Sequence, residues 1–360
     1  MPTDTSRVHL KSISCEALVA QPGQFDTIID VRSESEFALD HLPGAIHCPV
    51  LTDAERAQVG TLYKCSSPFD ARRLGAALVA SNIALALRSL LAERPRAWVP
   101  LVYCWRGGER SASMAHVMAR VGWRVHQLEG GYRAFRRTVA DALTTLPAQF
   151  RYRVLCGATG SGKSRLLRHL DRAGAQVLDL ESLAAHRGSV LGGLPDQPQP
   201  SQKAFETRLW WNLRQLDLAR PVFVESESRK IGDRQVPEAL LEAMRGSECV
   251  SLELPGPERI RLLRDEYRHH ERGLDRLCQQ LSCLTTLHGR ARVERWQALA
   301  RLADWDVLVS CLLQEHYDPV YQRSIRTNYR RVSQAVRLPI NSADSSDFER
   351  AACQLAQMDS

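Results

Sequence analysis

The chain of 360 residues has no run of 18 consecutive apolar residues, and it does not begin with a charged segment followed by an apolar one. We therefore expect neither a membrane-spanning helix nor a secretory signal. Cysteine occurs at ten positions, but no two cysteines form a C-x-x-C pair. This spacing argues against a zinc ribbon and a disulfide framework, and it is typical of a protein of the reducing cytoplasm.

Lysine is scarce, because only five of the 48 Lys and Arg residues are lysine, while the net charge is +7. An arginine-rich basic chain suits a phosphate-bearing partner, since guanidinium groups match the geometry of phosphate oxygens. Biased codon usage would produce the same composition without any such partner. Charge alone therefore does not distinguish a nucleotide, a nucleic acid and no anionic ligand.

The length predicts two domains of ordinary size, and the pattern of elements agrees. In the first half, strands alternate with helical stretches around residues 71–91 and 111–121. This alternation predicts a parallel sheet with helices on both faces. After residue 148 the pattern restarts, so we place the domains at 1–148 and 149–360.

The second half contains three candidate buried strands, in "AQVLDL", "PVFVESES" and "CVSLEL". From about Pro257 onward the chain is predicted to be wholly helical and rich in arginine. We therefore expect a second α/β domain with a helical C-terminal part.

The stretch "LVYCWRGGERSASMA", residues 101–115, contains the first candidate site. Cys104 follows an apolar strand and precedes a helix, where backbone N–H groups and the positive helix end stabilise a thiolate. The two glycines allow the backbone to fold tightly around an anion, and Arg110 would hold a tetrahedral oxyanion. A cysteine after a strand is usually a core residue, but these neighbours favour a catalytic thiol.

The first half resembles the rhodanese (sulfurtransferase) family, in "IIDVRSESEF", "HLPGAIHCP" and "EGGYRAF". The resemblance implies that Cys104 takes the position that carries a persulfide in those enzymes. Their loops usually place four residues between cysteine and arginine, whereas five separate Cys104 from Arg110. The wider loop is similar to that of the related cell-cycle phosphatases, and it predicts a phosphate-sized ligand.

The second candidate site is "GATGSGKS", which fits the phosphate-loop pattern G-x-x-x-x-G-K-[ST] between a strand and a helix. Backbone amides would cradle a di- or triphosphate, Lys163 would neutralise it and Ser164 would ligate Mg²⁺. The residues that we assign to this ligand are Gly157, Gly160, Ser161, Gly162, Lys163 and Ser164. Glu225 ends an apolar strand and is the candidate second Mg²⁺ ligand and catalytic acid, although a solvated strand-end carboxylate would look the same. The loop alone does not distinguish a nucleotide from a diphosphate ester or an activated prenyl group.

A rhodanese-like domain followed directly by a phosphate-loop domain resembles the bacterial tRNA 2-selenouridine synthase family. The matching sequence strings extend over more than 300 residues. The similarity extends to "AERAQVGTLYK", "LAAHRGSVLG", "PSQKAFE", "VFVESESRKIG" and "HYDPVYQRS". His186, Arg187, Ser189 and Glu206 lie in these strings without an assigned role. For His186, a purely structural role is an equal alternative.

The resemblance implies a rhodanese-like domain followed by a phosphate-loop α/β domain, and a transferase that modifies the wobble uridine of tRNA. It implies that 2-thiouridine becomes 2-selenouridine through an S-geranyl intermediate. Geranyl diphosphate and selenophosphate would be co-substrates, with Mg²⁺ at the phosphate loop. The implied partners are the tRNA anticodon arm and the enzyme that supplies selenophosphate.

Two basic tracts mix arginine with aromatic residues, as tRNA-binding segments do. The candidate tRNA ligands are Arg290, Arg292, Arg323 and Arg326, which would look the same on solvated helix faces. Two other functions remain open at this point. One is a small-molecule sulfurtransferase or thiol phosphatase fused to a nucleotide kinase, and the other is a nucleotide-gated binding module with an inert Cys104.

Overall fold

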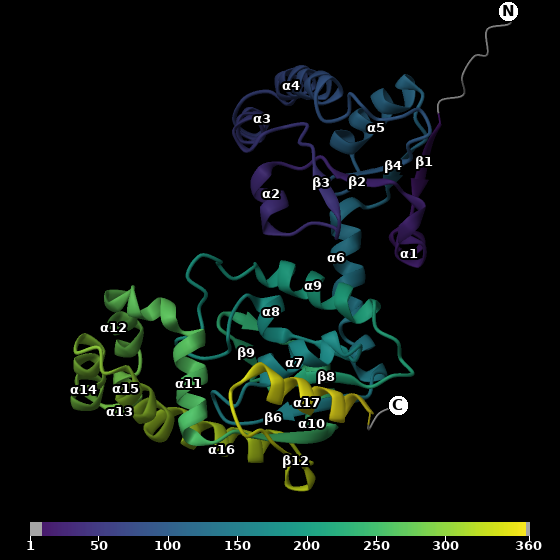
Figure 1. Cartoon of the computed structure of the whole chain (residues 1–360). Coiled ribbons are helices and arrows are strands. Elements are labelled where there is room, and N and C mark those ends of the chain that lie inside the picture. The colour runs from purple at the N-terminus through teal and green to yellow at the C-terminus, as the bar shows by residue number, and fades with distance from the viewer. Residues whose placement is uncertain (1–8, 358–360) are drawn as a thin grey trace, which may run out of the picture. The chain divides into compact units, whose positions relative to one another are not determined.

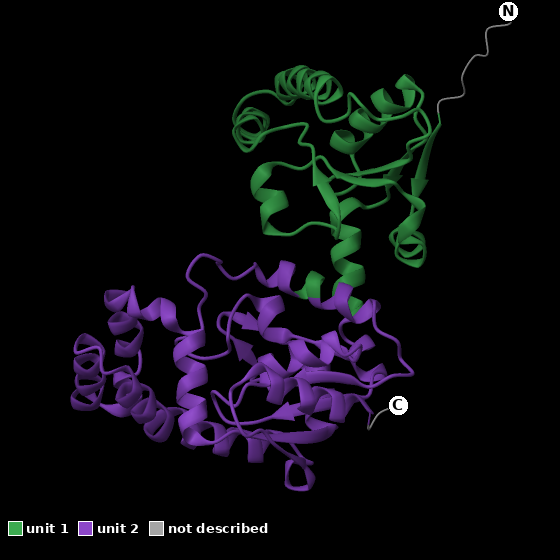
Figure 2. Ribbon diagram, in the orientation of Figure 1, with its two compact units in different colours: residues 1–142, 206–208 green, residues 143–205, 209–360 purple. Residues whose placement is uncertain are grey.

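The computed structural model describes residues 9–357, and the chain divides into two compact units (Figures 1 and 2). Unit 1 consists of Met1–Ala142 with Glu206–Arg208, and unit 2 of Leu143–Phe205 with Leu209–Ser360. We placed the domain boundary at residue 148, which lies shortly after Ala142, where the first segment of unit 1 ends. Among residues 9–357, no helix combines the length and apolar character needed to cross a membrane.

Unit 1 contains one sheet of five parallel strands in the order β1-β5-β4-β2-β3. The strands are β1 (Leu10–Ile13), β2 (Thr27–Asp30), β3 (Ala45–His47), β4 (Pro100–Tyr103) and β5 (Val125–Leu128). The central strand β4 is buried along its whole length, as expected of a parallel strand covered on both faces. The predicted α/β fold with a parallel sheet is confirmed.

Six α-helices accompany this sheet within the described part of unit 1. They are α1 (Cys15–Ala20), α2 (Glu34–Leu39), α3 (Asp53–Cys65), α4 (Pro68–Arg88), α5 (Glu109–Val121) and α6 (Gly131–Ala142). The helices predicted around 71–91 and 111–121 correspond to α4 and α5. We did not predict α3, although Thr52 and Glu55 form a capping box at its start.

Unit 2 contains a second sheet of five parallel strands, in the order β12-β11-β6-β8-β7. The strands are β6 (Tyr152–Cys156), β7 (Gln176–Leu178), β8 (Val222–Glu225), β11 (Glu248–Glu253) and β12 (Val336–Pro339). A short antiparallel hairpin joins β9 (Lys230–Ile231) to β10 (Arg234–Gln235). The three strands predicted in this half are confirmed as β7, β8 and β11.

The strand β12 corrects the prediction that everything after Pro257 is helical. It pairs in parallel with β11, with Val336 opposite Val250 and Leu338 opposite Leu252. Leu338 is buried while its neighbours are exposed, so only one side chain of this edge strand enters the core. A four-residue strand with one buried side chain carries too weak an apolar pattern to be recognised without its partner.

The helices of unit 2 fall into two groups. Those that precede β11 are α7 (Lys163–Arg172), α8 (Leu180–Ala184), α9 (Gln202–Arg214) and α10 (Glu238–Gly246). Those that follow it are α11 (Gly256–Glu266), α12 (Leu274–Ser282), α13 (Thr285–His288), α14 (Arg290–Arg301), α15 (Trp305–Leu312), α16 (Asp318–Asn328) and α17 (Ser345–Gln357). A single π-helical turn, Leu313–Tyr317, connects α15 to α16. Such turns often occur at functional sites.

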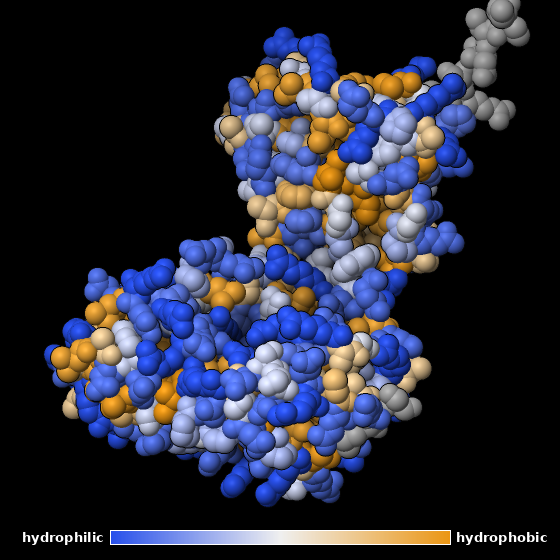
Figure 3. Space-filling view, viewed as in Figure 1, coloured by the Kyte–Doolittle hydropathy of each residue, from blue (hydrophilic) through white to orange (hydrophobic). Residues whose placement is uncertain are grey.

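Apolar residues of unit 2 form two separate clusters. One lies between the sheet and the helices α7 and α17, around Leu166 and Phe348. The other lies among α12, α14 and α15, around the fully buried Trp296. On the face shown in Figure 3, hydrophilic residues predominate over unit 2 and apolar residues form small separate patches.

Candidate active sites

Cys104 is the first residue after β4, and four residues separate it from the start of α5. Its side chain is buried, and the hydroxyl of Ser111 donates a hydrogen bond to Sγ at 3.1 Å. Gln127 in turn donates to Ser111 Oγ at 3.0 Å and to the carbonyl of Gly107 at 2.8 Å. The Ser111 hydroxyl also lies 3.1 Å from the carbonyl of Gly108, so Ser111 and Gln127 connect the sulfur of the predicted nucleophile to the backbone of its loop. The sequence reasoning did not identify Ser111 or Gln127.

Backbone hydrogen bonds from the segment "EGGYRAF" hold the thiol loop in place. The backbone N–H groups of Tyr132 and Arg133 donate to the carbonyls of Cys104 and Trp105, at 2.8 and 3.0 Å. Gly131 has a φ of +55°, and a Cβ at this position would lie 2.2 Å from the carbonyl oxygen of Cys104. Only glycine fits here, because both the conformation and the close approach exclude a side chain.

Arg110 lies on the first turn of α5, where its guanidinium group pairs with Glu36 of α2. The two N···O distances are 2.7 and 3.3 Å, so the contact is bidentate. Burial opposes ionisation of Glu36, but the hydrogen bond and charge of Arg110 outweigh it and lower the pKa of this carboxyl. Glu36 therefore fixes the position of the predicted oxyanion ligand. Its only signal in the sequence is its place in the "DVRSESEF" string.

Asp30 and Arg32 of the same string form a buried ion pair, with the shortest N···O distance at 2.6 Å. Tyr103 donates its hydroxyl to Asp30, and Arg32 lies 3.9 Å from the ring centre of Tyr132. The side chains of Asp30 and Arg32 are almost completely buried. The pair thus ties together β2, β4 and the start of α6, and it has a structural role.

The phosphate loop runs from β6 into α7, as the motif predicts. Gly160 and Gly162 have φ values of +79° and +83°, which only glycine adopts without strain. Lys163 folds back over the loop, and its Nζ donates to the carbonyl of Gly157 at 2.8 Å. The N–H of Gly157 donates to the hydroxyl of Tyr321, a residue of α16, at 2.6 Å. Ser161 is buried, and its Oγ has no hydrogen-bond partner among the described residues.

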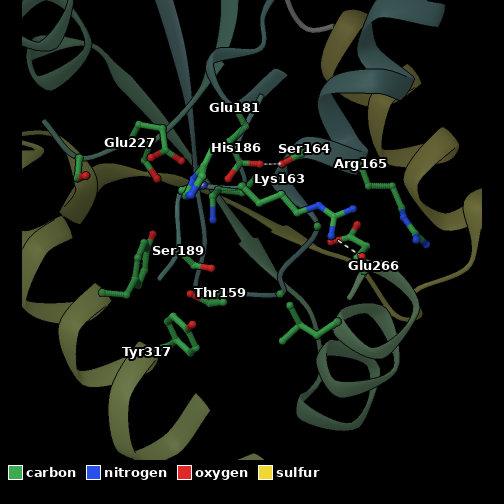
Figure 4. Close-up of a pocket in the computed structure, with 18 of the residues that line it drawn as sticks. Thr159, Lys163, Ser164, Arg165, Glu181, His186, Ser189, Glu227, Glu266 and Tyr317 are labelled. Carbon is green, nitrogen blue, oxygen red and sulfur yellow. Dashed lines mark hydrogen bonds between the residues drawn. The ribbon is translucent and has the colours of Figure 1, made fainter. Parts of the chain in front are cut away.

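A large pocket opens over this loop, and it brings together residues from both halves of unit 2 (Figure 4). Gly160, Gly162, Lys163 and Ser164 line it, whereas Gly157 and Ser161 do not. His186, Arg187 and Ser189, which had no assigned role, also line it. The strings "LAAHRGSVLG" and "HYDPVYQRS", far apart in the chain, therefore meet at one site.

Four acidic residues line the pocket and were not identified from the sequence, namely Asp179, Glu181, Glu227 and Glu266. Glu181 accepts a hydrogen bond from Ser164 Oγ at 2.7 Å, drawn as a dashed line in Figure 4. Burial raises the pKa of Glu181, although the Ser164 bond partly opposes this. Burial and the neighbouring Glu181 charge raise the pKa of Glu227 to about 8. Closely spaced carboxylates beside a lysine can hold a cation or accept a proton.

Glu225 lies at the end of β8, as predicted, but its side chain points into the interior and does not line the pocket. Its Oε1 accepts the backbone N–H of Glu181 at 2.9 Å, and its Oε2 has no partner among the described residues. Burial and the charges of neighbouring carboxylates, including Asp179 and Glu181, raise its pKa well above the usual range. The structure therefore pairs Ser164 with Glu181, and Glu225 supports the backbone of Glu181.

The residues around Ser164 fit a Mg²⁺ ion held together with a diphosphate. Mg²⁺ prefers oxygen ligands and is usually bound by one or two carboxylates plus substrate phosphates. Ser164 and Glu181 offer a hydroxyl and a carboxylate in direct contact at the mouth of the loop. Within residues 9–357, no cluster of three or more His, Cys, Asp or Glu side chains forms a complete metal site.

The four predicted tRNA-binding arginines fall into two classes. Arg290 pairs with Glu294 at 2.8 Å, and Arg292 pairs with Glu315 at 3.4 Å. Arg323 and Arg326 are exposed on α16, and neither pairs with a carboxylate of the described residues. The latter two offer uncompensated positive charge on the helix that also contributes Tyr321 to the phosphate-loop pocket.

Comparisons with known proteins match both units. A model of the rhodanese-like domain matches residues 14–138, and a model described as the tRNA 2-selenouridine synthase AAA domain matches residues 150–281. A tRNA 2-selenouridine synthase of Hydrogenovibrio crunogenus is 34% identical over 324 residues, which cover 82% of this chain and 88% of the relative. One of Nitrosomonas europaea is 36% identical over 247 residues, covering 67% of this chain and 63% of the relative. Among solved structures, a rhodanese-related protein of Thermoplasma volcanium is 18% identical with a TM-score of 0.24, covering 36% of this chain and 92% of that chain.

Proposed function

Because the chain belongs to the tRNA 2-selenouridine synthase family, we propose that it converts wobble 2-thiouridine of tRNA to 2-selenouridine through an S-geranyl intermediate. The observation that carries this proposal is the presence, in one chain, of a thiol loop and a phosphate loop, each at the carboxyl end of a parallel strand. Anions bind at such strand ends, where helix N-termini converge. The two loops lie in different units, which suits two successive reactions.

In the first reaction, the thione sulfur of 2-thiouridine attacks C1 of geranyl diphosphate. A carbon–sulfur bond forms, the carbon–oxygen bond breaks and diphosphate leaves. Lys163 and the loop amides stabilise the charge that develops on the departing diphosphate. Ser164 and Glu181 would hold Mg²⁺, which supplies additional positive charge to the same group.

Alkylation of the sulfur also requires the loss of the proton on N3 of the uridine ring. Glu227 suits the role of proton acceptor, because it lines the pocket and its pKa of about 8 matches a general base working near neutral pH. Glu225 acts through Glu181 as a positioning residue, because it holds the Glu181 backbone and does not reach the pocket.

In the second reaction, the Cys104 thiolate attacks the phosphorus of selenophosphate, so that a sulfur–phosphorus bond forms, the selenium–phosphorus bond breaks and selenide leaves. The selenide adds to C2 of the modified ring and geranylthiolate leaves, while water hydrolyses the sulfur–phosphorus bond and releases phosphate. The thiol loop, with five residues between Cys104 and Arg110, suits this phosphate-sized anion. We assign Cys104 as its nucleophile and Arg110 as its oxyanion ligand. The enzyme that makes selenophosphate is the partner that this step requires, and the reaction belongs in the cytoplasm with the tRNA pool.

The anticodon arm is proposed to contact α16 through Arg323 and Arg326, whose charges are uncompensated. Arg290 and Arg292 are weaker candidates, because carboxylates already neutralise them. Phosphate contacts by arginine position an RNA without reading its sequence, so these residues would serve both reactions.

The test is to incubate the full chain with 2-thiouridine tRNA, geranyl diphosphate and selenophosphate, and to analyse the nucleosides by mass spectrometry. We expect S-geranyl-2-thiouridine and 2-selenouridine. Lys163→Ala should lose both products, and tRNA that is already geranylated should restore the second one. A chain that forms neither nucleoside but phosphorylates a nucleotide would instead be the small-molecule enzyme considered above.

A further inference from the structure

A second, largely apolar cavity adjoins the phosphate-loop pocket. Five residues line both spaces, namely Thr159, Ser189, Leu263, Tyr267 and Tyr317. In Figure 4, Thr159, Ser189 and Tyr317 lie together, and Glu181 and Glu227 lie in another part of the pocket. The shared residues form a junction between a charged compartment and an apolar one.

The far part of the second cavity is formed by the helical region of unit 2. Its apolar lining includes Leu277 of α12, and Trp305, Leu308, Val309 and Leu312 of α15. Leu277, Leu308 and Leu312 belong to the apolar cluster around Trp296. The end of the cavity is therefore made of packed aliphatic side chains that set how deep a ligand can reach.

Most polar groups on the cavity wall already have partners, although Nε of Arg264 has none among the described residues. His270 interacts through Nε2 with the carbonyl of Leu191 at 3.2 Å, and the hydroxyls of Ser189 and Tyr267 lie 3.3 Å apart. Arg264, at the edge, pairs with Glu271 at 3.6 Å. A nucleotide base would bury its own donors and acceptors against this wall without compensation, which is costly. A hydrocarbon has no such groups.

We propose that this apolar cavity binds the hydrocarbon chain of a prenyl diphosphate whose diphosphate lies on the phosphate loop, and that α15 limits the length of that chain. This assignment rests on the proposed function. A ligand with an anionic head and an apolar tail needs a polar cradle and an apolar space that meet, and the five junction residues provide this meeting point. Tyr267 and Tyr317 at the junction place aromatic rings beside the carbon that would react.

Val309 gives the most direct test, because it is half-buried and lines the cavity, so its substitution disturbs the core less than that of Leu308. Val309→Phe should fill the cavity and Val309→Ala should enlarge it. Val307→Phe is the matched control, because Val307 lies on the same helix, is 44% exposed and does not line the cavity.

The full-length variants are assayed with 2-thiouridine tRNA and with dimethylallyl, geranyl and farnesyl diphosphates, and kcat/KM is measured for each. Val309→Phe should lower kcat/KM for the geranyl compound about tenfold or more relative to the dimethylallyl compound. Val309→Ala should shift the ratio towards the farnesyl compound. Inhibition by inorganic diphosphate should stay unchanged, since the phosphate loop is untouched.

The outcomes separate this inference from the proposed function. If the unsubstituted chain transfers no prenyl group from any of the three diphosphates, the proposed function fails. If it transfers the geranyl group but both Val309 variants keep the chain-length profile of Val307→Phe, the cavity assignment is wrong and the proposed function stands. Should Val309→Phe fail to fold, the opposite shift expected of Val309→Ala decides the question.

Discussion

At the scale of single residues, the Cys104 sulfur lies 3.1 Å from the hydroxyl of Ser111, which is held in turn by Gln127 and also contacts the carbonyl of Gly108. Replacing Cys104 with Ser removes the proposed nucleophile from unit 1 and leaves unit 2 unchanged. We therefore expect Cys104→Ser to abolish selenium incorporation while S-geranyl-2-thiouridine still forms and accumulates. Mass spectrometry of nucleosides from the reaction measures both products.

The buried Cys48 provides a control for this substitution, since it lies in the same apolar cluster as Cys104 but outside the thiol loop. Cys48→Ser should keep both activities in a chain that melts at a lower temperature. Equal loss of geranylation and selenation in a folded Cys104→Ser protein would contradict the division of labour between the two loops.

Glu227 is the residue for which the structure gives a pH dependence. Its pKa is raised to about 8, so its carboxyl is mostly protonated at pH 7 and becomes a base as the pH increases. The geranylation rate should therefore increase with pH up to about 8 and level off above it. Glu227→Gln should remove this increase and lower the rate by roughly 10²–10⁴-fold, the usual effect of losing a general base. A variant with the rate and the pH profile of the unsubstituted chain would exclude Glu227 as the base.

The acidic residues also mark the limit of what the sequence could predict about the site. The motif identified Lys163 and Ser164, because a phosphate loop is local in the chain. The carboxylate that contacts Ser164 belongs to α8, which follows β7, and no spacing rule connects it to the loop. Glu225 was the natural choice from the sequence because it ends a strand, but its side chain is buried in the interior, whereas Glu227, two residues beyond the end of β8, lines the pocket.

At the scale of elements, the thiol loop depends on the turn that precedes α6. A side chain at Gly131 would need φ of +55° and would meet the carbonyl of Cys104 at 2.2 Å. We expect Gly131→Ala to distort the loop, to abolish selenation and to destabilise unit 1 by more than about 1 kcal/mol, while geranylation persists. Chemical denaturation and the nucleoside assay measure these effects.

Gly44→Ala is the control for Gly131→Ala, because it introduces backbone strain without a steric clash. Gly44 has a φ of +75°, but a Cβ there would meet nothing within 4 Å. This control should lose some stability and keep selenium transfer. If Gly131→Ala also keeps selenium transfer, the contact between the two turns does not shape the thiol loop.

The elements that the sequence predicted are those with a strong local signal. The strand before Cys104 is a continuous apolar run, the strand before the phosphate loop is apolar except for Arg153, and α4 and α5 are rich in apolar residues, so these elements were recognised. The helix α3 was missed because none of its residues is fully buried, so the apolar face that packs against α4 is weak. The edge strand β12 was missed because its pairing with β11 joins residues more than 80 positions apart.

At the scale of the whole molecule, both proposed reactions act on the same nucleoside of one tRNA, so the RNA must be bound through contacts that do not depend on either loop. The net charge of +7 supplies an attraction for the RNA backbone. Many arginines of unit 2 are paired with carboxylates, whereas Arg323 and Arg326 are exposed and have no carboxylate partner among the described residues.

Replacing Arg323 and Arg326 together with Ala should weaken tRNA binding and flatten its dependence on salt. Each arginine that neutralises a phosphate releases counterions, so each lost contact should reduce the slope of log affinity against log salt by about 0.7–0.9. Arg290→Ala with Arg292→Ala is the matched control, because Arg290 pairs with Glu294 and Arg292 with Glu315, which Arg295 also contacts, so the slope should change less than in the Arg323 and Arg326 variant. Binding of inorganic diphosphate should remain the same in both variants, since none of the four side chains lines the phosphate-loop pocket. If the Arg323 and Arg326 variant keeps its affinity and slope while the control loses them, the RNA surface is on α14 and the assignment to α16 is wrong.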